Sequence, residues 1–356
     1  MGLIGRTILT AAAVAAFILG PPANEVRAGQ ANTVVDSLGR TVTIPGKVER
    51  IISLAPEITR IIVALGAGER LVGIDFFLRH HDHLFPLIAP EAARLPVVSN
   101  QGQDLNYELA LRLRPDLVFA SPSEFRMAES IEKKLRAPVI SMASVGRIEA
   151  LLEEIALLGR VLGLEERAAR LTALFDERLG PQRKLAGAAA GRSGPTVYMS
   201  FWGSLVRTPV VYEPLDIAGG RNVAAGILPD YLGAAGATVS IERLVGWDPE
   251  VILVQGNYPP DERRVTVEGI LSDPRLASLR AVRTRRVHYT FGYWYWWDPA
   301  LVVVETLYLR RLLHPEEGPT PDLAVEADRM FKEFYGVAGA YEALCRVLRC
   351  HEWIPR

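Results

Sequence analysis

Short apolar runs alternate along the chain with segments in which apolar residues recur at every third or fourth position. The runs have the length and composition of buried strands, and the segments between them have the period of amphipathic helices. Strands that alternate with helices form parallel sheets with right-handed crossovers. We therefore predict an α/β fold with strands at 50–54, 71–74, 117–120, 138–141, 196–199, 251–254 and 286–290.

A longer helical pattern separates these strands into two groups. From Arg147 to Leu179 apolar residues keep three- and four-residue spacing, and Gly159 and Gly163 mark the middle, where a kink or break is easiest. A helix of about 30 residues spans roughly 45 Å, which suits a rigid connection. We predict two α/β lobes with mostly parallel sheets, at 29–145 and 190–356, joined by one long rigid α-helix at 146–180.

Three smaller elements complete the prediction. Alternating residues around a central glycine at 34–45 are typical of a hairpin. Helical patterns at 299–313 and 323–348 follow the last strand.

Both halves of the chain repeat one pattern. A helix-capping residue, Asn106 or Ser240, precedes a Glu by two positions, and a Pro and an apolar strand follow at equal spacing. A Glu in the first turn of any helix gains about 0.3–1 kcal/mol from the macrodipole, so each Glu alone needs no further role. The matched spacing predicts that Glu108 and Glu242 are equivalent surface carboxylates, one on each lobe.

The N-terminus has the features of a secretory signal peptide. Arg6 precedes an apolar stretch at 8–19, and small residues lead to an expected cleavage near Ala28. No Cys lies near that point, so we do not expect a lipoprotein. We predict a signal peptide at 1–28 and a mature periplasmic protein.

Charge and composition narrow the class of partner. The chain has 356 residues, 49% of them hydrophobic, which is enough for two domains with cores. Its 40 basic and 41 acidic residues give a net charge of -1, so we expect no nucleic-acid partner. We expect a monomer.

Cys345 and Cys350 are the only cysteines. They lack the spacing of a redox or metal motif, and a disulfide between them requires the helix to end before Cys350. The sequence leaves open whether they pair.

Several segments together resemble the iron-siderophore and cobalamin class of periplasmic binding proteins of ABC importers. The resemblance covers essentially the whole mature chain. It rests on the doubled Glu pattern and on VDSLGRTV at 35–42, RIISLAP at 50–56, LGA at 65–67, IAGGRNV at 217–223 and LSDP at 271–274.

The resemblance implies two Rossmann-like lobes that hold a ligand in a cleft between them and close little. In that class one Glu on each lobe docks into arginine pockets of the permease, and Glu108 and Glu242 occupy these positions. The implied partners are an ABC permease dimer with its ATPase. The implied cargo is a metal chelate, such as an iron(III)-siderophore, haem or a corrinoid, and no resident cofactor is implied.

Ligands of open α/β sheets lie beyond the carboxyl ends of the strands, so the loops there are the candidate contacts. The strongest signal is a run of aromatic residues after the last strand, because flat rings stack on a bulky chelate. The same rings can instead pack as core between the lobes. We predict ligand contacts from Trp294, Trp296, Tyr293 and Tyr295, and from Trp202 and Phe201 after the strand at 196–199.

The loop after the second strand contains His80, His81 and His83. Imidazoles suit transition ions, although neighbours in one short loop rarely converge on one ion. We predict His81 as a ligand contact and keep the three histidines as a candidate metal site. Arg79, Arg126 and Arg207 are candidate partners for carboxylates or an oxyanion.

We therefore predict the substrate-binding component of an ABC importer with a metal-chelate cargo. The alternative cargo is a molybdate- or tungstate-type oxyanion held at the helix N-terminus formed by Ala55, Pro56 and Glu57. An exported hydrolase built on the three histidines is disfavoured, because HExxH and GxSxG are absent. A signalling partner in place of a transporter leaves the same sequence features. The sequence does not identify the cargo.

Overall fold

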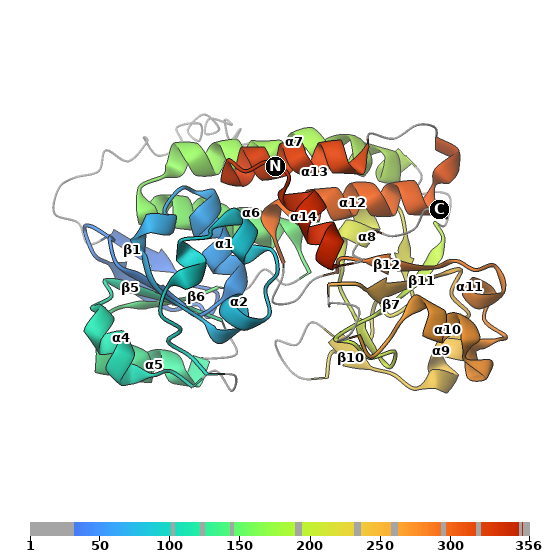
Figure 1. Ribbon diagram of the computed structural model, residues 1–356, viewed down its shortest axis with the longest axis horizontal. Coiled ribbons are helices and arrows are strands. Elements are labelled where there is room, and N and C mark those ends of the chain that lie inside the picture. The colour runs from blue at the N-terminus through green and yellow to red at the C-terminus, as the bar shows by residue number, and fades with distance from the viewer. Residues whose placement is uncertain are drawn as a thin grey trace, which may run out of the picture. The chain divides into compact units, whose positions relative to one another are not determined.

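Two parallel four-stranded sheets with the same topology organise the protein (Figure 1). The computed structural model describes residues 32–100, 104–121, 125–142, 146–188, 194–230, 236–257, 263–292, 297–317, 322–348 and 351. The first sheet has the order β4-β3-β5-β6 and the second β12-β11-β7-β9. With the strands of each lobe numbered in chain order, the first sheet has the order second, first, third, fourth. The second sheet has the same order when it is read from β9 to β12, which confirms two similar lobes. The strands are β3 (Ile51–Ser53), β4 (Leu71–Ile74), β5 (Leu117–Ala120), β6 (Val139–Ser141), β7 (Thr196–Ser200), β9 (Arg221–Asn222), β11 (Val251–Gln255) and β12 (Val287–Thr290).

Two antiparallel pairs accompany these sheets. The predicted hairpin at 34–45 is formed by β1 (Asn32–Val35) and β2 (Thr41–Ile44). The second pair joins β8 (Arg207–Pro209) to β10 (Gly236–Thr238), and the sequence pattern did not predict it.

The helices lie between and around the strands. Those of the first lobe are α1 (Pro56–Ala64), α2 (Phe76–His80), α3 (Phe85–Ile88), α4 (Tyr107–Leu113) and α5 (Phe125–Leu135). The second lobe contains α8 (Glu213–Ile217), α9 (Ile241–Trp247), α10 (Val267–Ser272), α11 (Arg280–Arg283), α12 (Pro299–Leu313), α13 (Leu323–Tyr335) and α14 (Ala340–Val347). Single 3-10 turns lie at Gly68–Arg70, Ala92–Arg94, Pro274–Leu276 and Pro315–Glu317.

The prediction of one helix over 146–180 is wrong. The chain forms α6 (Ile148–Leu162) and α7 (Glu165–Ala188), and Gly163 ends α6 in the left-handed conformation with φ +69°. A Cβ on Gly159 would lie 2.5 Å from the Cβ of Ala168, so the absence of a side chain there lets the two helices pack closely. The two glycines that interrupt the predicted helix thus allow the chain to turn back between α6 and α7.

The long connection between the lobes is α7, and the start of α6 also contacts the second lobe, since the N–H of Ile148 donates to Glu213 of α8. The 24 residues of α7 correspond to about 36 Å. Near its start Arg167 donates to the carbonyl of Ala64 at 3.0 Å, at the end of α1. Near its end Arg183 lies 3.6 Å from Glu213 of α8. The expected long connector is therefore present, but it begins later in the chain than predicted.

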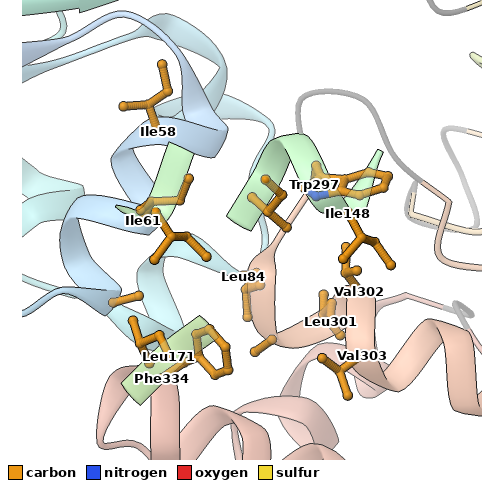
Figure 2. Close-up of a cluster of buried hydrophobic side chains, with 14 of the residues drawn as sticks. Ile58, Ile61, Leu84, Ile148, Leu171, Trp297, Leu301, Val302, Val303 and Phe334 are labelled. Atoms are coloured by element: carbon orange, nitrogen blue, oxygen red, sulfur yellow. The ribbon is translucent and has the colours of Figure 1, made fainter. Parts of the chain in front are cut away.

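One apolar cluster continues from the first lobe into the second. Figure 2 shows Ile58 and Ile61 of α1 in the same cluster as Leu171 of α7 and Leu301 of α12. Trp297, at the start of α12, is 2% exposed within it. Separating the lobes would expose this surface to water, at about 25 cal/mol per Å². The cluster therefore opposes large changes in the angle between the lobes.

The C-terminal helices pack across the same region. α13 lies against α12 and α1, and α14 lies against α13 and α3. Because α14 ends at Val347, the helix does not extend to Cys350, as a disulfide requires. Cys350 lies outside the described residues, so whether it pairs with Cys345 stays open.

Within the part of the chain that the structure describes, no helix has both the length and the apolar character of a membrane span.

Candidate functional site

The repeated Glu pattern forms the same local structure in both lobes. The side chain of Asn106 accepts a hydrogen bond from the N–H of Leu109 at 3.1 Å, and that of Ser240 accepts one from Arg243 at 3.2 Å. The two helices, α4 and α9, end in left-handed residues, Arg114 with φ 45° and Asp248 with φ 42°. Each leads into the third strand of its sheet, β5 or β11. Glu108 and Glu242 therefore occupy equivalent positions.

Both carboxylates are exposed. Glu108 forms an ion pair with Arg112 in which both side chains remain more than 70% exposed, and such pairs contribute about 0–1 kcal/mol. Hydrogen bonds from its own backbone N–H and from Ser240 hold the pKa of Glu242 below its ordinary value. In Figure 1, α4 and α9 lie on the same side of the molecule, across the two sheets from α7. This placement leaves both carboxylates available to one flat partner.

Two partly or fully buried acids lie at the carboxyl ends of β3 and β4. Glu57 opens α1, and burial raises its pKa to about 7. Asp75 caps α2 by accepting from the N–H groups of Phe77 at 2.7 Å and Leu78 at 3.2 Å. Its second oxygen, Oδ2, is buried without a partner, and burial raises the pKa of Asp75 well above its ordinary value. This edge of the first sheet, called the acidic edge below, therefore carries two carboxyl groups that burial makes harder to ionise.

The N-terminus of α1 offers little to an external anion. Pro56, its first residue, has no N–H, and the N–H of Glu57 bonds the carboxylate of the same residue. A side-chain anion already occupies the position where an oxyanion was expected at Ala55, Pro56 and Glu57.

We expect Glu57 to make stability depend on pH. Since its pKa rises from 4.5 to about 7, the unfolded chain loses this proton at a lower pH than the folded chain. The free energy of unfolding should therefore fall as pH rises from about 4.5 to 7, and Glu57→Gln should make this fall smaller, the remainder coming from other buried carboxyl groups with raised pKa values such as Asp75. Urea denaturation of both proteins between about pH 5 and 8 measures it. Parallel pH profiles would contradict the prediction.

The corresponding edge of the second lobe carries an aromatic shelf, formed by Phe201 and Trp202 after β7. The rings stack with centroids 4.8 Å apart. Phe201 is 1% exposed and belongs to the core, so it supports the ring of Trp202 and does not itself contact a ligand as predicted. Trp202 is partly exposed. Its backbone N–H donates to Oε1 of Gln255 at 2.8 Å, and the guanidinium of Arg207 lies 4.4 Å from its ring. Trp202 is therefore the ring of this shelf that can meet a ligand.

Most of the other predicted ligand contacts lie outside the part of the chain that the structure describes. Tyr293, Trp294, Tyr295 and Trp296 lie outside the described residues, and so does the side chain of Arg126. Arg79 donates to the carbonyl of Ala93. The ligand contacts expected of the four aromatic residues and of Arg126 therefore remain predictions, whereas the Arg79 side chain already has a partner within its own lobe.

The three histidines do not form a metal centre in the described structure. His80 and His81 pack near Phe76, with ring centroids 4.3 and 5.7 Å away. Among the described residues, three potential ligand side chains lie within 4.8 Å of one another only at His314, Glu316 and Glu317. Only His80 lies in α2, which ends there, whereas His81 is the C-cap and His83 lies beyond the helix.

A buried ionic group between the lobes was not foreseen. Arg60 of α1 is 0% exposed and pairs with Asp82, which also accepts from the N–H of Leu84 at 2.8 Å. Asp298, the N-cap of α12, accepts from the Tyr335 hydroxyl. Burial raises the pKa of Asp298, while the charge of Arg60 opposes that shift. The group links α1 to α12 and α13.

A second buried group holds the end of β12. Glu305 of α12 accepts from the N–H of Phe291 at 3.1 Å and from the hydroxyl of Tyr212 at 2.9 Å. His351 lies 2.6 Å from the same carboxylate. The C-terminal segment is thereby tied to the strand that precedes the aromatic run.

Sequence reasoning also missed Asn257, which follows β11. It is 1% exposed, and neither polar atom of its side chain has a hydrogen-bond partner. No motif marks this position; only its place after a central strand could have drawn attention to it.

Two lobes of equal topology, a connecting helix, and polar and aromatic residues at the carboxyl ends of the strands define a two-lobed solute-binding protein. The chain belongs to the periplasmic binding protein family, whose pattern matches residues 51–291. It is the substrate-binding component of an ABC transporter and not an enzyme, as predicted, and the family implies a permease, an ATPase and a small-molecule ligand as partners.

Proteins that bind different cargoes are similar to this chain. The chain is 26% identical over 331 residues to the molybdate-binding protein MolA of Haemophilus influenzae, covering 85% of this chain and 90% of that protein. A solved structure of MolA with molybdate bound superimposes with a TM-score of 0.71 at 23% identity, over 86% of this chain and 98% of MolA. The vitamin B12-binding protein of Vibrio parahaemolyticus is 27% identical over 224 residues, or 60% of this chain and 74% of that protein. The predicted resemblance to the iron-siderophore and cobalamin class is confirmed.

Proposed function

We propose that this protein binds a bulky metal chelate, of the iron(III)-siderophore, haem or corrinoid type, and delivers it to an ABC permease. The observation that carries the proposal is the Trp202 ring at the carboxyl end of β7, supported by Phe201 and covered on one side by Arg207. Because Phe201 and Arg207 lie against the Trp202 ring, the partly exposed edge of the ring is the part that can contact an organic ligand. The aromatic residues at 293–296 follow β12 in the sequence and are predicted ligand contacts as well.

The charge at the acidic edge of the first lobe also favours a chelate as the cargo. Glu57 is half ionised near pH 7, so a small dianion placed at this edge would meet its negative charge, to which Asp75 adds little because burial raises the pKa of Asp75 well above its ordinary value. A chelate distributes its charge over a larger body and keeps it farther from these carboxyl groups. The acidic edge thus favours a chelate over an oxyanion.

The second candidate cargo is a molybdate- or tungstate-type oxyanion. The likeness to MolA over most of both chains favours it. Such a cargo requires donors other than the N-terminus of α1, which Glu57 occupies. Arg207 is one cation near the site, although it already lies 3.4 Å from Asp230.

We further propose the route and the partner contacts. Residues 1–28 act as a cleaved signal peptide, and the mature protein works as a periplasmic monomer. Glu108 and Glu242 dock into the permease, and the supply of iron or cobalamin is the physiological role.

Protein purified from its own periplasm tests the cargo. Native mass spectrometry with absorbance should show a coloured organic adduct: a Soret band for haem, a corrin spectrum, or the broad visible band of an iron chelate. Titration with sodium molybdate is the parallel measurement. A colourless adduct of oxyanion mass, together with tight molybdate binding, would contradict the proposed chelate and identify an oxyanion as the cargo.

A further inference from the structure

We propose that Asn257 is a cargo-binding residue, and that its carboxamide pairs with a group of the cargo that offers both a hydrogen-bond donor and an acceptor, as a primary amide does. The inference rests on the proposed function, because it places the cargo at the carboxyl ends of the strands.

The position of Asn257 suits this role. It lies two residues beyond Gln255, the last residue of β11, and β11 lies between β7 and β12 in the sheet. Gly256 still donates to the carbonyl of Thr290 at 2.7 Å, so the backbone remains tied to β12 up to the residue before Asn257. Gln255 contacts the backbone of Trp202. Asn257 therefore lies at the carboxyl edge that also carries the aromatic shelf.

The side chain of Asn257 is buried but unsatisfied. Both Oδ1 and Nδ2 lack a hydrogen-bond partner, although only 1% of the residue is exposed. Native proteins rarely leave a buried amide in this state, because desolvating it without a partner is costly. A ligand group that fills both sites would remove the cost when it binds.

Asn222 in the same lobe shows what a structural asparagine looks like. It is 7% exposed, its Nδ2 donates to the carbonyl of Pro209 at 2.9 Å, and its Oδ1 accepts from the N–H of Ala224 at 2.9 Å. The fold itself therefore satisfies Asn222, whereas it leaves Asn257 open. This difference separates a residue that serves the fold from one that serves the cargo.

The chemistry of the partner follows from the amide itself. An amide side chain has two donor hydrogens and one acceptor oxygen, so it is best matched by another amide. A carboxylate of the cargo would satisfy only the donors and would leave Oδ1 without a partner. Among metal chelates, one whose periphery bears carboxamides satisfies both polar atoms.

The test compares Asn257→Leu, Asn257→Asp and Asn222→Leu with the wild type. Cyanocobalamin, whose corrin ring bears primary amides, is the chelate probe, and sodium molybdate is titrated in parallel. Thermal unfolding of the cargo-free proteins is measured as well. We expect Asn257→Leu to weaken cyanocobalamin binding by about tenfold or more, with a melting temperature equal to or above that of the wild type. Asn257→Asp should also bind more weakly, and Asn222→Leu should lower the melting temperature and leave the affinity of the folded protein unchanged.

Three outcomes would overturn the inference. These are unchanged cyanocobalamin affinity in Asn257→Leu, which is also the result if an ordered water satisfies the amide; a melting temperature lowered as much as in Asn222→Leu; and failure of Asn257→Leu to fold. If the wild type binds molybdate and not the chelate, the proposed cargo fails separately. The inference then fails with it, because molybdate presents no amide.

Discussion

Charge reversal at both Glu108 and Glu242 is expected to abolish uptake of the cargo while leaving its affinity for the protein unchanged. The two carboxylates are exposed and lie on equivalent helices. Two contacts on one rigid body act together, since the first fixes the second at a high effective concentration. A single reversal should therefore reduce uptake, and the double variant Glu108→Arg, Glu242→Arg should eliminate it.

Uptake of labelled cargo in cells, or in vesicles with the reconstituted transporter, measures this effect, and a binding titration measures affinity. Glu91→Arg with Glu342→Arg is the matched control. Both of these glutamates are exposed and each pairs with an arginine on its own helical turn, as Glu108 does, so the change in net charge is the same. Normal transport by the Glu108 and Glu242 variant would remove the docking role.

Asp82→Asn is expected to reduce the free energy of unfolding by about 3–5 kcal/mol, because it leaves the buried charge of Arg60 without its ion-pair partner. The substitution keeps the oxygen that accepts from Leu84 and Phe85, so the loss reports the charge and not the cap. Urea denaturation followed by tryptophan fluorescence provides the measurement.

Two further variants separate the explanations. Arg60→Met combined with Asp82→Asn should recover most of the stability, since no charge is then stranded at this pair. Glu91→Gln, which breaks an exposed pair, should change stability by no more than about 1 kcal/mol. A loss below that size in Asp82→Asn would show that water or Asp298 compensates Arg60.

Local signals in the sequence predicted the elements well. The helix at 299–313 begins and ends where the structure has it, because Asp298 caps it and Pro299 fits its first turn. The capping residues Asn106 and Ser240 identified α4 and α9 for the same reason. Each of these signals lies within one turn of the element that it defines.

Contacts between distant segments were not predictable in this way. The ion pair of Arg60 depends on how α1 approaches the loop at Asp82, and its neighbours Asp298 and Tyr335 come from the other lobe. The reversal at Gly163 had a local signal, but only the close approach of Ala168 to Gly159 makes a turn preferable to a bend. The state of Asn257 likewise depends on what surrounds it, and not on its neighbours in sequence.

The apolar cluster that runs through both lobes has a consequence for how the transporter distinguishes a loaded protein from an empty one. A permease that recognised the loaded protein by closure of the two lobes would find little difference between the loaded and the empty protein, because the shared apolar cluster limits that closure. Occupancy must then be read at the mouth of the site, from the cargo itself or from the loops that touch it.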